Sequence, residues 1–351
     1  MPDYDFRSLS PYEFQALVHD LLEERLGVGI ESFSPGPDSG IDLRFEDAGG
    51  SGVIQCKHWI DSGYSALLSE LKRVEVEKVR RLAPRRYMIA TSVALTPRRK
   101  DAIRQLFRPF CRSMVDIRGP ADLNALLRRY PDVEKAHFKL WLTSEAVLSR
   151  ILRPGILVDS DLAARRMEQR LSRYVPNPSF PRALEILQQH HYCIIAGPPG
   201  IGKTTLAEAL CAHYIARGFQ LVPIRPTLAQ VTDARNPRKK QVFYYDDFLG
   251  RTNLDKLDNN EDQRIVEFMA DAEQNDRWRF LLTTREYILN AARTRYETLA
   301  HPPLELRECV INLSDYTGHI RARILYNHIY FSDLPSAPAQ PSRSGNLRWG
   351  D

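Results

Sequence analysis

Apolar residues follow a helical period near the start of the chain and then give way to strand-like segments. In "SPYEFQALVHDLLEERLG", Ser10 suits an N-cap, Glu13 completes a capping box three residues later, and Gly27 ends the pattern. The apolar positions at helical spacing are Phe14, Leu17, Val18, Leu21 and Leu22. Two short segments follow, "IDLRF" and "VIQCKHW", separated by the turn-rich "EDAGGSG". The pattern predicts a helix followed by two strands that a turn joins.

The next hundred residues alternate between helical and strand patterns. A basic helix is expected over about 64–82, a buried strand at "RYMIATS", and a helix at "TPRRKDAIRQLFRPF" with Thr96 as its cap and Pro97 at its first position. A strand at "SMVDIRG" and a closing helix at "GPADLNALLRRY" complete the series. The order α-β-β-α-β-α-β-α predicts a compact α/β domain with a mixed sheet over residues 1–135.

A helical linker and a second α/β domain are expected beyond that point. Residues 136–178 read as helix, broken by Pro154-Gly155 and closed by the prolines of "VPNPSFP". Residues 179–334 contain the buried strand "HYCIIA", the helix "TTLAEALCAHYIARG" and two further strands, "QVFYY" and "WRFLLTTRE". The Pro/Ser-rich residues 335–351 predict a disordered tail.

Composition fits a protein of the cytoplasm. The 351 residues are 43% hydrophobic and 26% charged, which is ordinary for a globular chain of two domains. No apolar run is long enough to span a bilayer, and the polar start "MPDYDFRSLS" is unlike a secretory signal. The five cysteines are scattered without a CxxC pair, which argues against a disulfide framework or a zinc site. We therefore expect a cytoplasmic protein with no membrane partner.

Positive charge is concentrated in one part of the first domain. Between Lys72 and Arg112 the chain has thirteen Lys and Arg against three acidic residues. Such a surface attracts polyphosphates and releases counterions when it binds them, so it indicates contacts with the DNA backbone that do not depend on base sequence. The other interpretation is a solvated helix face.

The clearest motif is the phosphate loop of the second domain, "IIAGPPGIGKTTLA". Gly197, Gly202, Lys203 and Thr204 fit G-x-x-x-x-G-K-[ST], with a buried strand before the loop and a helix after it. The glycines let backbone amides surround the phosphates, Lys203 would reach the β- and γ-phosphates, and Thr204 would hold Mg²⁺. The predicted nucleotide-binding residues of this loop are Gly197, Pro198, Pro199, Gly200, Ile201, Gly202, Lys203, Thr204 and Thr205.

Acidic and basic residues at two later strand ends suit the same ligand. "QVFYY" is followed by Asp246, which would hold Mg²⁺ through water, and by Asp247, which would act as the base that orients the attacking water. Arg285 ends "WRFLLTTR" and would sense the γ-phosphate. An acidic turn and a surface cation are the structural alternatives for these residues.

The segments "AGPPGIGKTTLAEAL", "FYYDDFLG" and "FLLTTREYIL" together resemble novel STAND-type P-loop NTPases over roughly residues 175–335. This resemblance implies a parallel-sheet NTPase domain in which ATP or ADP switches the protein between a resting state and an assembled homo-oligomer. "DYTGHIRARILYNHIYFSDLP" resembles the start of the helical module that follows the nucleotide core. The rest of that module and the sensor region of the family are not in this sequence, which indicates a truncated gene or a fragment.

The strand pattern of the first domain brings three polar side chains together. Asp42 alternates with the apolar residues of "IDLRF", which place Ile41, Leu43 and Phe45 on the other face, and Gln55 and Lys57 share one face of "VIQCK". A hairpin would therefore set Asp42 beside Gln55 and Lys57. This trio suits phosphodiester hydrolysis: Asp42 and the carbonyl of Cys56 would hold Mg²⁺, Gln55 would be a weaker oxygen ligand, and Lys57 would position water or neutralise charge.

The series "SPYEFQALVHDLLEERLG", "PGPDSGIDL", "VIQCKHW" and "YMIATS" resembles the Mrr-like branch of the PD-(D/E)xK restriction endonucleases over about residues 4–130. The resemblance implies a restriction-endonuclease-like fold in which Glu13 assists the metal site; Glu13 is also the capping-box residue. The expected protein is a Mg²⁺-dependent DNA endonuclease coupled to an ATP-binding switch in prokaryotic antiphage defence. The alternatives are a nucleotide-gated DNA-binding scaffold with an inactive cleavage centre and an ATP-driven, modification-dependent restriction enzyme.

Overall fold

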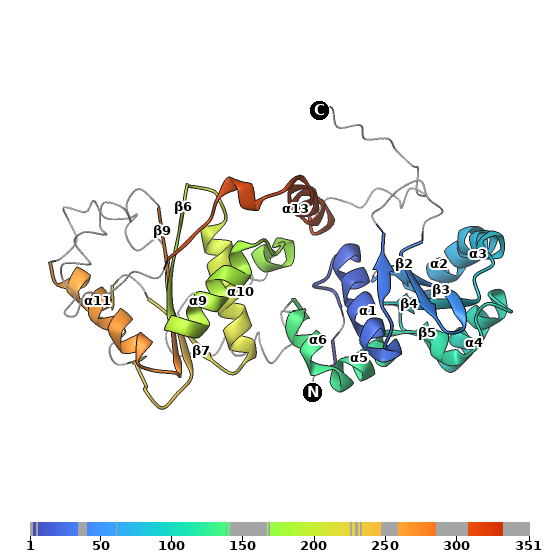
Figure 1. Ribbon diagram of the computed structural model, residues 1–351, viewed down its shortest axis with the longest axis horizontal. Helices are drawn as coiled ribbons and strands as arrows, with labels where there is room; N and C mark the ends of the chain where they lie inside the picture. The colour runs from blue at the N-terminus through green and yellow to red at the C-terminus, as the bar shows by residue number, and fades with distance from the viewer. Residues whose placement is uncertain are drawn as a thin grey trace. The chain divides into compact units, whose positions relative to one another are not determined.

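The computed structural model contains two compact units, Met1–Ser144 and Glu145–Ser332, each with its own sheet (Figure 1). It describes residues 3–4, 6–33, 41–60, 62–137, 139–140, 167, 169–224, 227–228, 231, 234–246, 259–285 and 308–332. Among these residues no helix is both long and apolar enough to cross a membrane. The domain boundaries given above stay a prediction, and most of the expected linker lies outside the described residues.

The first unit has the predicted mixed sheet, in the order β1-β2-β3-β4-β5. β1 (Ile30–Ser32), β2 (Leu43–Asp47) and β3 (Gly50–Lys57) pair antiparallel. β4 (Arg86–Thr91) and β5 (Ile117–Arg118) then continue parallel to β3. The carboxyl ends of β3, β4 and β5 therefore lie along one edge of the sheet, which β2 approaches with its amino end.

Helices cover both faces of this sheet (Figure 1). One apolar cluster packs the first set of helices onto the side chains of Leu43, Phe45 and Ile54, and a second cluster packs the other set onto Val53, Tyr87 and Ile89. The first set is α1 (Pro11–Leu26), α5 (Pro120–Arg129) and α6 (Pro131–Ala136), and the second set is α2 (Gly63–Glu70), α3 (Val76–Leu82) and α4 (Pro97–Leu106).

Helix ends in the first unit follow local sequence signals, and three elements differ from the predictions. Ser10 and Glu13 form the capping box of α1, and Gly27 ends that helix in a left-handed conformation at φ 68°. The helix expected over 64–82 contains a π-helical turn, Leu71–Glu75, between α2 and α3. The strand expected at 113–119 is only Ile117–Arg118, because a 3₁₀ turn occupies Met114–Asp116. α4 ends at Leu106, short of the expected Phe110.

One predicted side-chain direction is wrong. Ile41 packs against the cluster under α2, α3 and α4, on the face opposite Leu43 and Phe45. The reason is that β2 begins only at Leu43, so the strand alternation does not extend back to Ile41. Asp42 is therefore the last residue before the strand and not one of its alternating positions.

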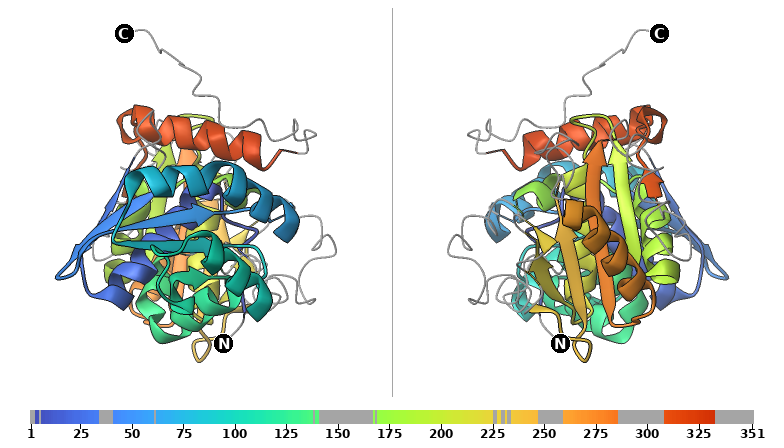
Figure 2. Two further views of the ribbon diagram at one scale, coloured as in Figure 1. Left: turned by 90° about the vertical axis from the view of Figure 1, so that its right-hand side faces the viewer. Right: turned by 90° about the vertical axis from the view of Figure 1, so that its left-hand side faces the viewer.

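The second unit has a parallel sheet in the order β10-β6-β9-β8-β7, with α9 and α10 on one face and α11 on the other (Figures 1 and 2). The two short edge strands, β7 and β10, carry no clear sequence pattern and were not predicted. The strands are β6 (Tyr192–Gly197), β7 (Gln220–Pro223), β8 (Gln241–Tyr245), β9 (Trp278–Arg285) and β10 (Glu308–Val310). The helices are α9 (Ser179–His190), α10 (Lys203–Ala216), α11 (Asn259–Glu273) and α13 (Gly318–Tyr330).

The insertion of β9 between β6 and β8 positions the nucleotide site. In the register of these parallel strands Gly197 is opposite Arg285, and Tyr245 is opposite Leu282. The phosphate loop after β6, the acid after β8 and the arginine at the end of β9 therefore lie at the same edge of the sheet. This edge, at the carboxyl ends of the strands, is where ligands bind in open α/β sheets.

Candidate functional site

The phosphate loop turns sharply between β6 and α10. Gly200 and Gly202 adopt φ angles of 77° and 101°, which are unfavourable for residues with a side chain. α10 begins at Lys203, with Gly202 as its N-cap. The Lys203 ammonium donates to the carbonyls of Gly197 at 3.1 Å and Pro198 at 3.0 Å, so it lies against the loop that it would serve. The loop thus places a lysine and a helix N-terminus together, which suits a polyphosphate.

Asp246 lies beside the threonine predicted to share its metal ion. Its Oδ1 accepts hydrogen bonds from Thr204 Oγ1 at 3.1 Å and from Thr283 Oγ1 at 2.8 Å. Thr283 comes from β9 and helps to fix the carboxylate of Asp246. Its role was missed because a threonine inside a β-strand is an ordinary strand residue. The pairing of Thr204 with Asp246 provides the oxygen ligands that Mg²⁺ prefers.

The structure describes one of the two other residues predicted at this edge. Asp247 lies outside the described residues. Arg285 is half-buried at the end of β9, opposite Gly197 in the strand register, so it is at the right edge of the sheet for a phosphate sensor. Its sensor role stays a prediction.

A cavity of about 360 Å³ adjoins the phosphate loop. The Tyr316 hydroxyl donates to the carbonyl of Ile201 at 2.5 Å, which joins the segment before α13 to the loop. The cavity residues outside the loop could not be found from the sequence, because they come from segments that are far apart in the chain and share no motif. The cavity is lined by Arg170, Arg173, Tyr174, Val175, Gly200, Ile201, Gly202, Thr205, Tyr316, Ile324 and His328.

In the first unit, the predicted trio converges at the edge formed by the amino end of β2 and the carboxyl end of β3. Gln55 Nε2 donates to Asp42 Oδ2 at 2.6 Å, and the backbone N–H of Cys56 donates to the same oxygen at 2.7 Å. Because both donors use Oδ2, Oδ1 is the oxygen of Asp42 that could ligate a cation. Lys57 follows on the same face of β3 as Gln55.

A fourth residue, Glu75, belongs to this cluster. Lys57 Nζ lies 2.8 Å from Glu75 Oε1, and Lys78 Nζ lies 3.4 Å from the same atom. The side chains of Lys57 and Glu75 are only 13% and 2% exposed. Glu75 continues the i, i+4 series of Leu67 and Leu71, so the signal that could have found it is an acid within the apolar stripe of a helix.

Burial changes the protonation of Asp42. It raises the pKa of the carboxyl group from 3.8 to about 6, and the negative charge of Glu75 adds to the effect. The N–H of Cys56 and the ammonium groups of Lys57 and Lys78 act in the opposite direction. The carboxylate is therefore ionised near neutral pH at a cost in free energy, which a bound cation would reduce.

The ligand atoms available at this site are oxygens, the type that Mg²⁺ prefers. Oδ1 of Asp42 and the carbonyl of Cys56 are hard oxygen ligands, and Mg²⁺ keeps several waters when it has few protein ligands. Gln55 directs its Nε2 toward Asp42, so it would contribute its oxygen only after the amide turns over. Among the described residues no group of three or more His, Cys, Asp and Glu side chains is arranged to hold a metal. The cation would therefore rest mainly on Asp42 and backbone.

Glu13 is engaged at the start of α1. One of its carboxylate oxygens accepts hydrogen bonds from Ser10 N at 2.8 Å and Ser10 Oγ at 3.0 Å, and the other lies 2.5 Å from Lys139 Nζ. These contacts give Glu13 a clear structural role, so they favour the capping interpretation over its predicted assistance to the metal.

Comparison with known proteins finds a different family for each of two parts of the chain. Residues 6–94 match the family model of the Mrr catalytic domain, described as "Restriction endonuclease", and residues 174–331 match "Novel STAND NTPase 3". Both resemblances inferred from the sequence are confirmed. An uncharacterised protein of Sinorhizobium fredii, y4cD, is 36% identical over 248 residues, which cover 68% of this chain and 38% of that protein. The chain thus spans about two fifths of the length of this relative.

Solved structures give weaker similarities. The DnaC helicase loader matches 48% of this chain and 100% of its own, at 15% identity and a TM-score of 0.24. NtrX from Brucella abortus, solved in complex with ATP, matches 74% of this chain and 56% of its own, at 14% identity and a TM-score of 0.25. TM-scores this low support no conclusion about function.

We predict that Asp42→Asn stabilises the metal-free protein near neutral pH. Between pH 3.8 and about 6 the folded state binds more protons at Asp42 than the unfolded chain does, so stability falls as pH rises through this window. The shift of about two units corresponds to about 3 kcal/mol. Urea unfolding in chelator across this window should show a flatter pH dependence for the variant and a higher unfolding free energy at neutral pH.

Asp47→Asn is the matched control, because Asp47 is an exposed carboxylate at the other end of β2. It should keep the pH dependence of the parent. An Asp42→Asn protein that loses stability at neutral pH would contradict the electrostatic account.

Proposed function

Because the chain joins an Mrr-type restriction endonuclease domain to a novel STAND NTPase domain, we propose that it is a Mg²⁺-dependent DNA endonuclease controlled by a nucleotide switch. The observation that carries the nuclease half is the convergence of Asp42, Gln55 and Lys57 at one sheet edge, with Glu75 holding the lysine. Together these groups combine a cation site with an ammonium group placed beside it.

Each residue has a separate part in phosphodiester hydrolysis. Asp42 and the carbonyl of Cys56 would hold Mg²⁺, with Gln55 as a further oxygen donor. Bound there, Mg²⁺ supplies Lewis-acid polarisation of the phosphodiester and of the attacking water. Lys57 would neutralise the negative charge that develops on the phosphate. Glu75 is a positioning residue, because its buried carboxylate fixes Lys57 at 2.8 Å and balances its charge.

Exposed cations on the helices beside the sheet would hold the DNA backbone. Lys72, Arg73, Arg80 and Arg81 are exposed on the helix that carries Glu75, and Arg98 is exposed on α4. Arg73, Lys78 and Lys100 are paired with Glu70, Glu75 and Asp122, so they would contribute less. Contacts of this kind position the duplex without reading its sequence, and each neutralised phosphate adds about 0.9 to the salt slope of binding.

The second unit would bind ATP or ADP through the phosphate loop, with Thr204 and Asp246 holding Mg²⁺. Asp247 as base and Arg285 as γ-phosphate sensor complete the proposal. The 360 Å³ cavity would take the nucleoside, because it opens beside Thr205 and has Tyr174 and Val175 in its wall. A nucleotide there would contact the segment before α9, the phosphate loop and α13 together. Because its affinity would then depend on how these three parts are arranged, nucleotide binding could change their arrangement.

The biological role we propose is cytoplasmic antiphage defence in a prokaryote, with assembly into a homo-oligomer on activation. The pairing of a nuclease region with a STAND NTPase region supports this role. A nucleotide-gated DNA-binding scaffold is the alternative. Among the described residues, no cluster of three or more acidic, His or Cys side chains could hold a metal. This observation favours the scaffold, because cleavage needs a bound cation.

The nuclease proposal predicts that Asp42→Ala and Lys57→Ala each reduce Mg²⁺-dependent nicking of plasmid DNA by at least about 100-fold. Glu75→Gln should cause a smaller loss, because it frees Lys57 without removing its charge. Circular dichroism would verify that the variants fold. Asp47→Ala, at the opposite end of β2, should cleave like the parent. Cleavage by both Asp42→Ala and Lys57→Ala at the parental rate would refute the proposal, and DNA binding without cutting by the parent would favour the scaffold.

The nucleotide proposal predicts that Lys203→Ala abolishes binding of a fluorescent ATP analogue, while Lys240→Ala outside the site leaves it unchanged. Tyr174→Ala should weaken ATP and ADP alike, because the cavity faces the nucleoside they share. Slow turnover with tight nucleotide retention would support a switch. Rapid turnover stimulated by DNA would instead support an ATP-driven restriction enzyme.

A further inference from the structure

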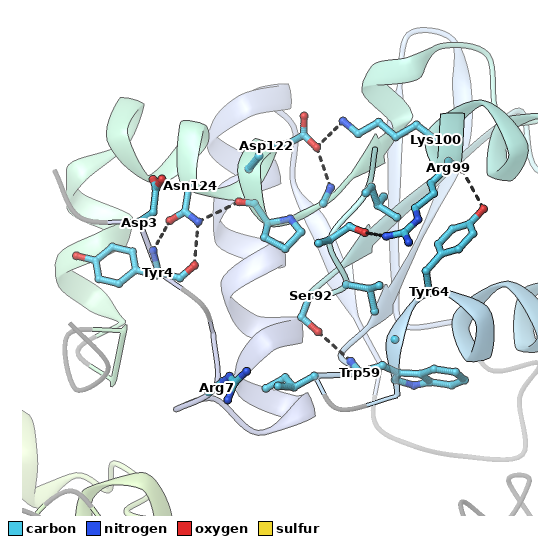
Figure 3. Close-up of a pocket in the computed structure, with 18 residues that line it drawn as sticks. Asp3, Tyr4, Arg7, Trp59, Tyr64, Ser92, Arg99, Lys100, Asp122 and Asn124 are labelled. Carbon is cyan, nitrogen blue, oxygen red and sulfur yellow. Dashed lines mark hydrogen bonds and ion pairs between the residues drawn. The ribbon is translucent and has the colours of Figure 1, made fainter. Parts of the chain in front are cut away.

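A second cavity, of about 770 Å³, opens in the first unit at the carboxyl ends of β3, β4 and β5 (Figure 3). Its wall is formed by residues that directly follow these strands: Trp59 after β3, Ser92 to Leu95 after β4, and Gly119 after β5. The volume lies in the range of about 300–1,000 Å³ that is usual for sites of small ligands. The cavity is therefore large enough for a whole nucleotide.

Hydrogen bonds join this cavity to the strand end that carries Lys57. The carbonyl of Lys57 accepts from Ser92 N at 3.2 Å and from Thr91 Oγ1 at 2.8 Å. The N–H of Trp59 donates to Ser92 Oγ at 2.9 Å. The cavity and the cleavage centre thus share one edge of the sheet, and a strand of DNA bound at that edge could reach both.

The lining offers flat surfaces for a base. Trp59 and Tyr64 both line the cavity, and the guanidinium of Arg99 lies 4.6 Å from the centre of the Tyr64 ring (Figure 3). Arg99 is held there by a hydrogen bond from its Nη1 to the carbonyl of Ala94 at 3.1 Å. Aromatic rings and stacked guanidinium groups bind unpaired bases by stacking, whatever the base.

The charges around the cavity favour an anion beside the base. The lining contains three cationic side chains, those of Arg7, Arg99 and Lys100, and two carboxylates, those of Asp3 and Asp122. Both acids are already paired, Asp122 with Lys100 and Asp3 with Arg128, each at 2.6 Å. Arg99 has no carboxylate partner in the part of the chain that the structure describes.

Backbone dipoles act in the same direction as Arg99. α2, α4 and α5 all begin at residues that line this cavity or adjoin it, and helix N-termini carry partial positive charge. A phosphate group would therefore be attracted to the same space as the base that stacks on the aromatic rings.

We propose that this cavity receives one unstacked nucleotide of the DNA strand, next to the phosphate that is cut. The base would stack against Trp59 and Tyr64, and Arg99 would hold the attached phosphate. This inference rests on the proposed nuclease function and adds its substrate class: DNA with an unpaired or weakly paired nucleotide near the cut. Extrusion of such a nucleotide costs less than extrusion of a paired one, so the cavity selects it.

Photo-cross-linking tests occupancy without cleavage. The full-length Asp42→Asn chain would be irradiated with a duplex that carries a single bulged 5-iododeoxyuridine, and the adducts would be mapped by mass spectrometry. The expected result is cross-linking to Trp59 or Tyr64 that Arg99→Gln reduces. Adducts only at other residues would overturn the proposal, even if the parent cuts DNA.

A competition arm separates the two sources of this chemistry. An unlabelled bulged oligonucleotide should suppress the cross-link at micromolar concentration, while free deoxynucleoside monophosphates should not. Suppression by the free nucleotide alone would show that the cavity is a mononucleotide site and would overturn the assignment to the DNA strand.

Cleavage rates test selectivity. The parent should cut a duplex with one bulged nucleotide faster than its fully paired counterpart, by about 5- to 150-fold if the preference equals the stacking contribution of one base. Trp59→Ala should bring the ratio of the two rates close to one, and Trp59→Phe should restore most of it.

Two arginine variants complete the cleavage test. Arg99→Gln should lower the rate ratio without removing an aromatic ring, so it keeps the test valid if Trp59→Ala fails to fold. Arg25→Gln is the matched control, since Arg25 is exposed in the last turn of α1, and it should keep the parental ratio. A parental ratio in both Trp59→Ala and Arg99→Gln would overturn the proposal and leave the nuclease intact. A parent that cuts no DNA would refute the nuclease, and the cross-link would still decide whether the cavity is occupied.

Discussion

The buried ion pair between Lys57 and Glu75 is the interaction on which the first site depends. Two acids, Asp42 and Glu75, and two ammonium groups, those of Lys57 and Lys78, meet where the sheet edge adjoins the helix. Removal of one member of a buried pair costs about 3–5 kcal/mol, because the other charge is left without compensation. The cluster therefore ties the position of the strand end to that of the helix, and the lysine is held ready before any ligand binds.

In both units the candidate site lies at the carboxyl ends of parallel strands. Parallel strands end at one edge, and the residues that follow them come close in space although they are distant in the sequence. In the second unit this edge joins the phosphate loop to Asp246 through Thr204 and Thr283. In the first unit it places Lys57 on the strand whose continuation, Trp59, lines the large cavity. The chemistry of each unit is thus a consequence of strand order.

The sequence was sufficient wherever a local rule decides the conformation. The glycines of the phosphate loop and the cap at Ser10 follow from backbone sterics and helix capping. The meeting of Asp42 with Gln55 was predicted from strand alternation, but it comes from the antiparallel pairing of β2 with β3, which puts the residue before β2 beside the end of β3. Glu75 was missed although its place in the i, i+4 series of Leu67 and Leu71 is visible in the sequence, whereas no sequence rule marks the π-helical turn that contains it. The role of Thr283 depends on β9 lying between β6 and β8, which is decided by long-range pairing.

In the second unit, the cavity beside the phosphate loop is lined by segments that lie outside the nucleotide core. Arg170, in the helical residues 169–173 before α9, forms a bidentate pair with the buried Glu208 of α10. The next residues, Arg173 to Val175, form part of the cavity wall together with Tyr316 and His328. A ligand changes an equilibrium only through the difference in its affinity for the two states. Segments on both sides of the nucleotide core contribute to this pocket, so under the proposed function a rearrangement of either would alter nucleotide affinity, which is the coupling that a switch requires.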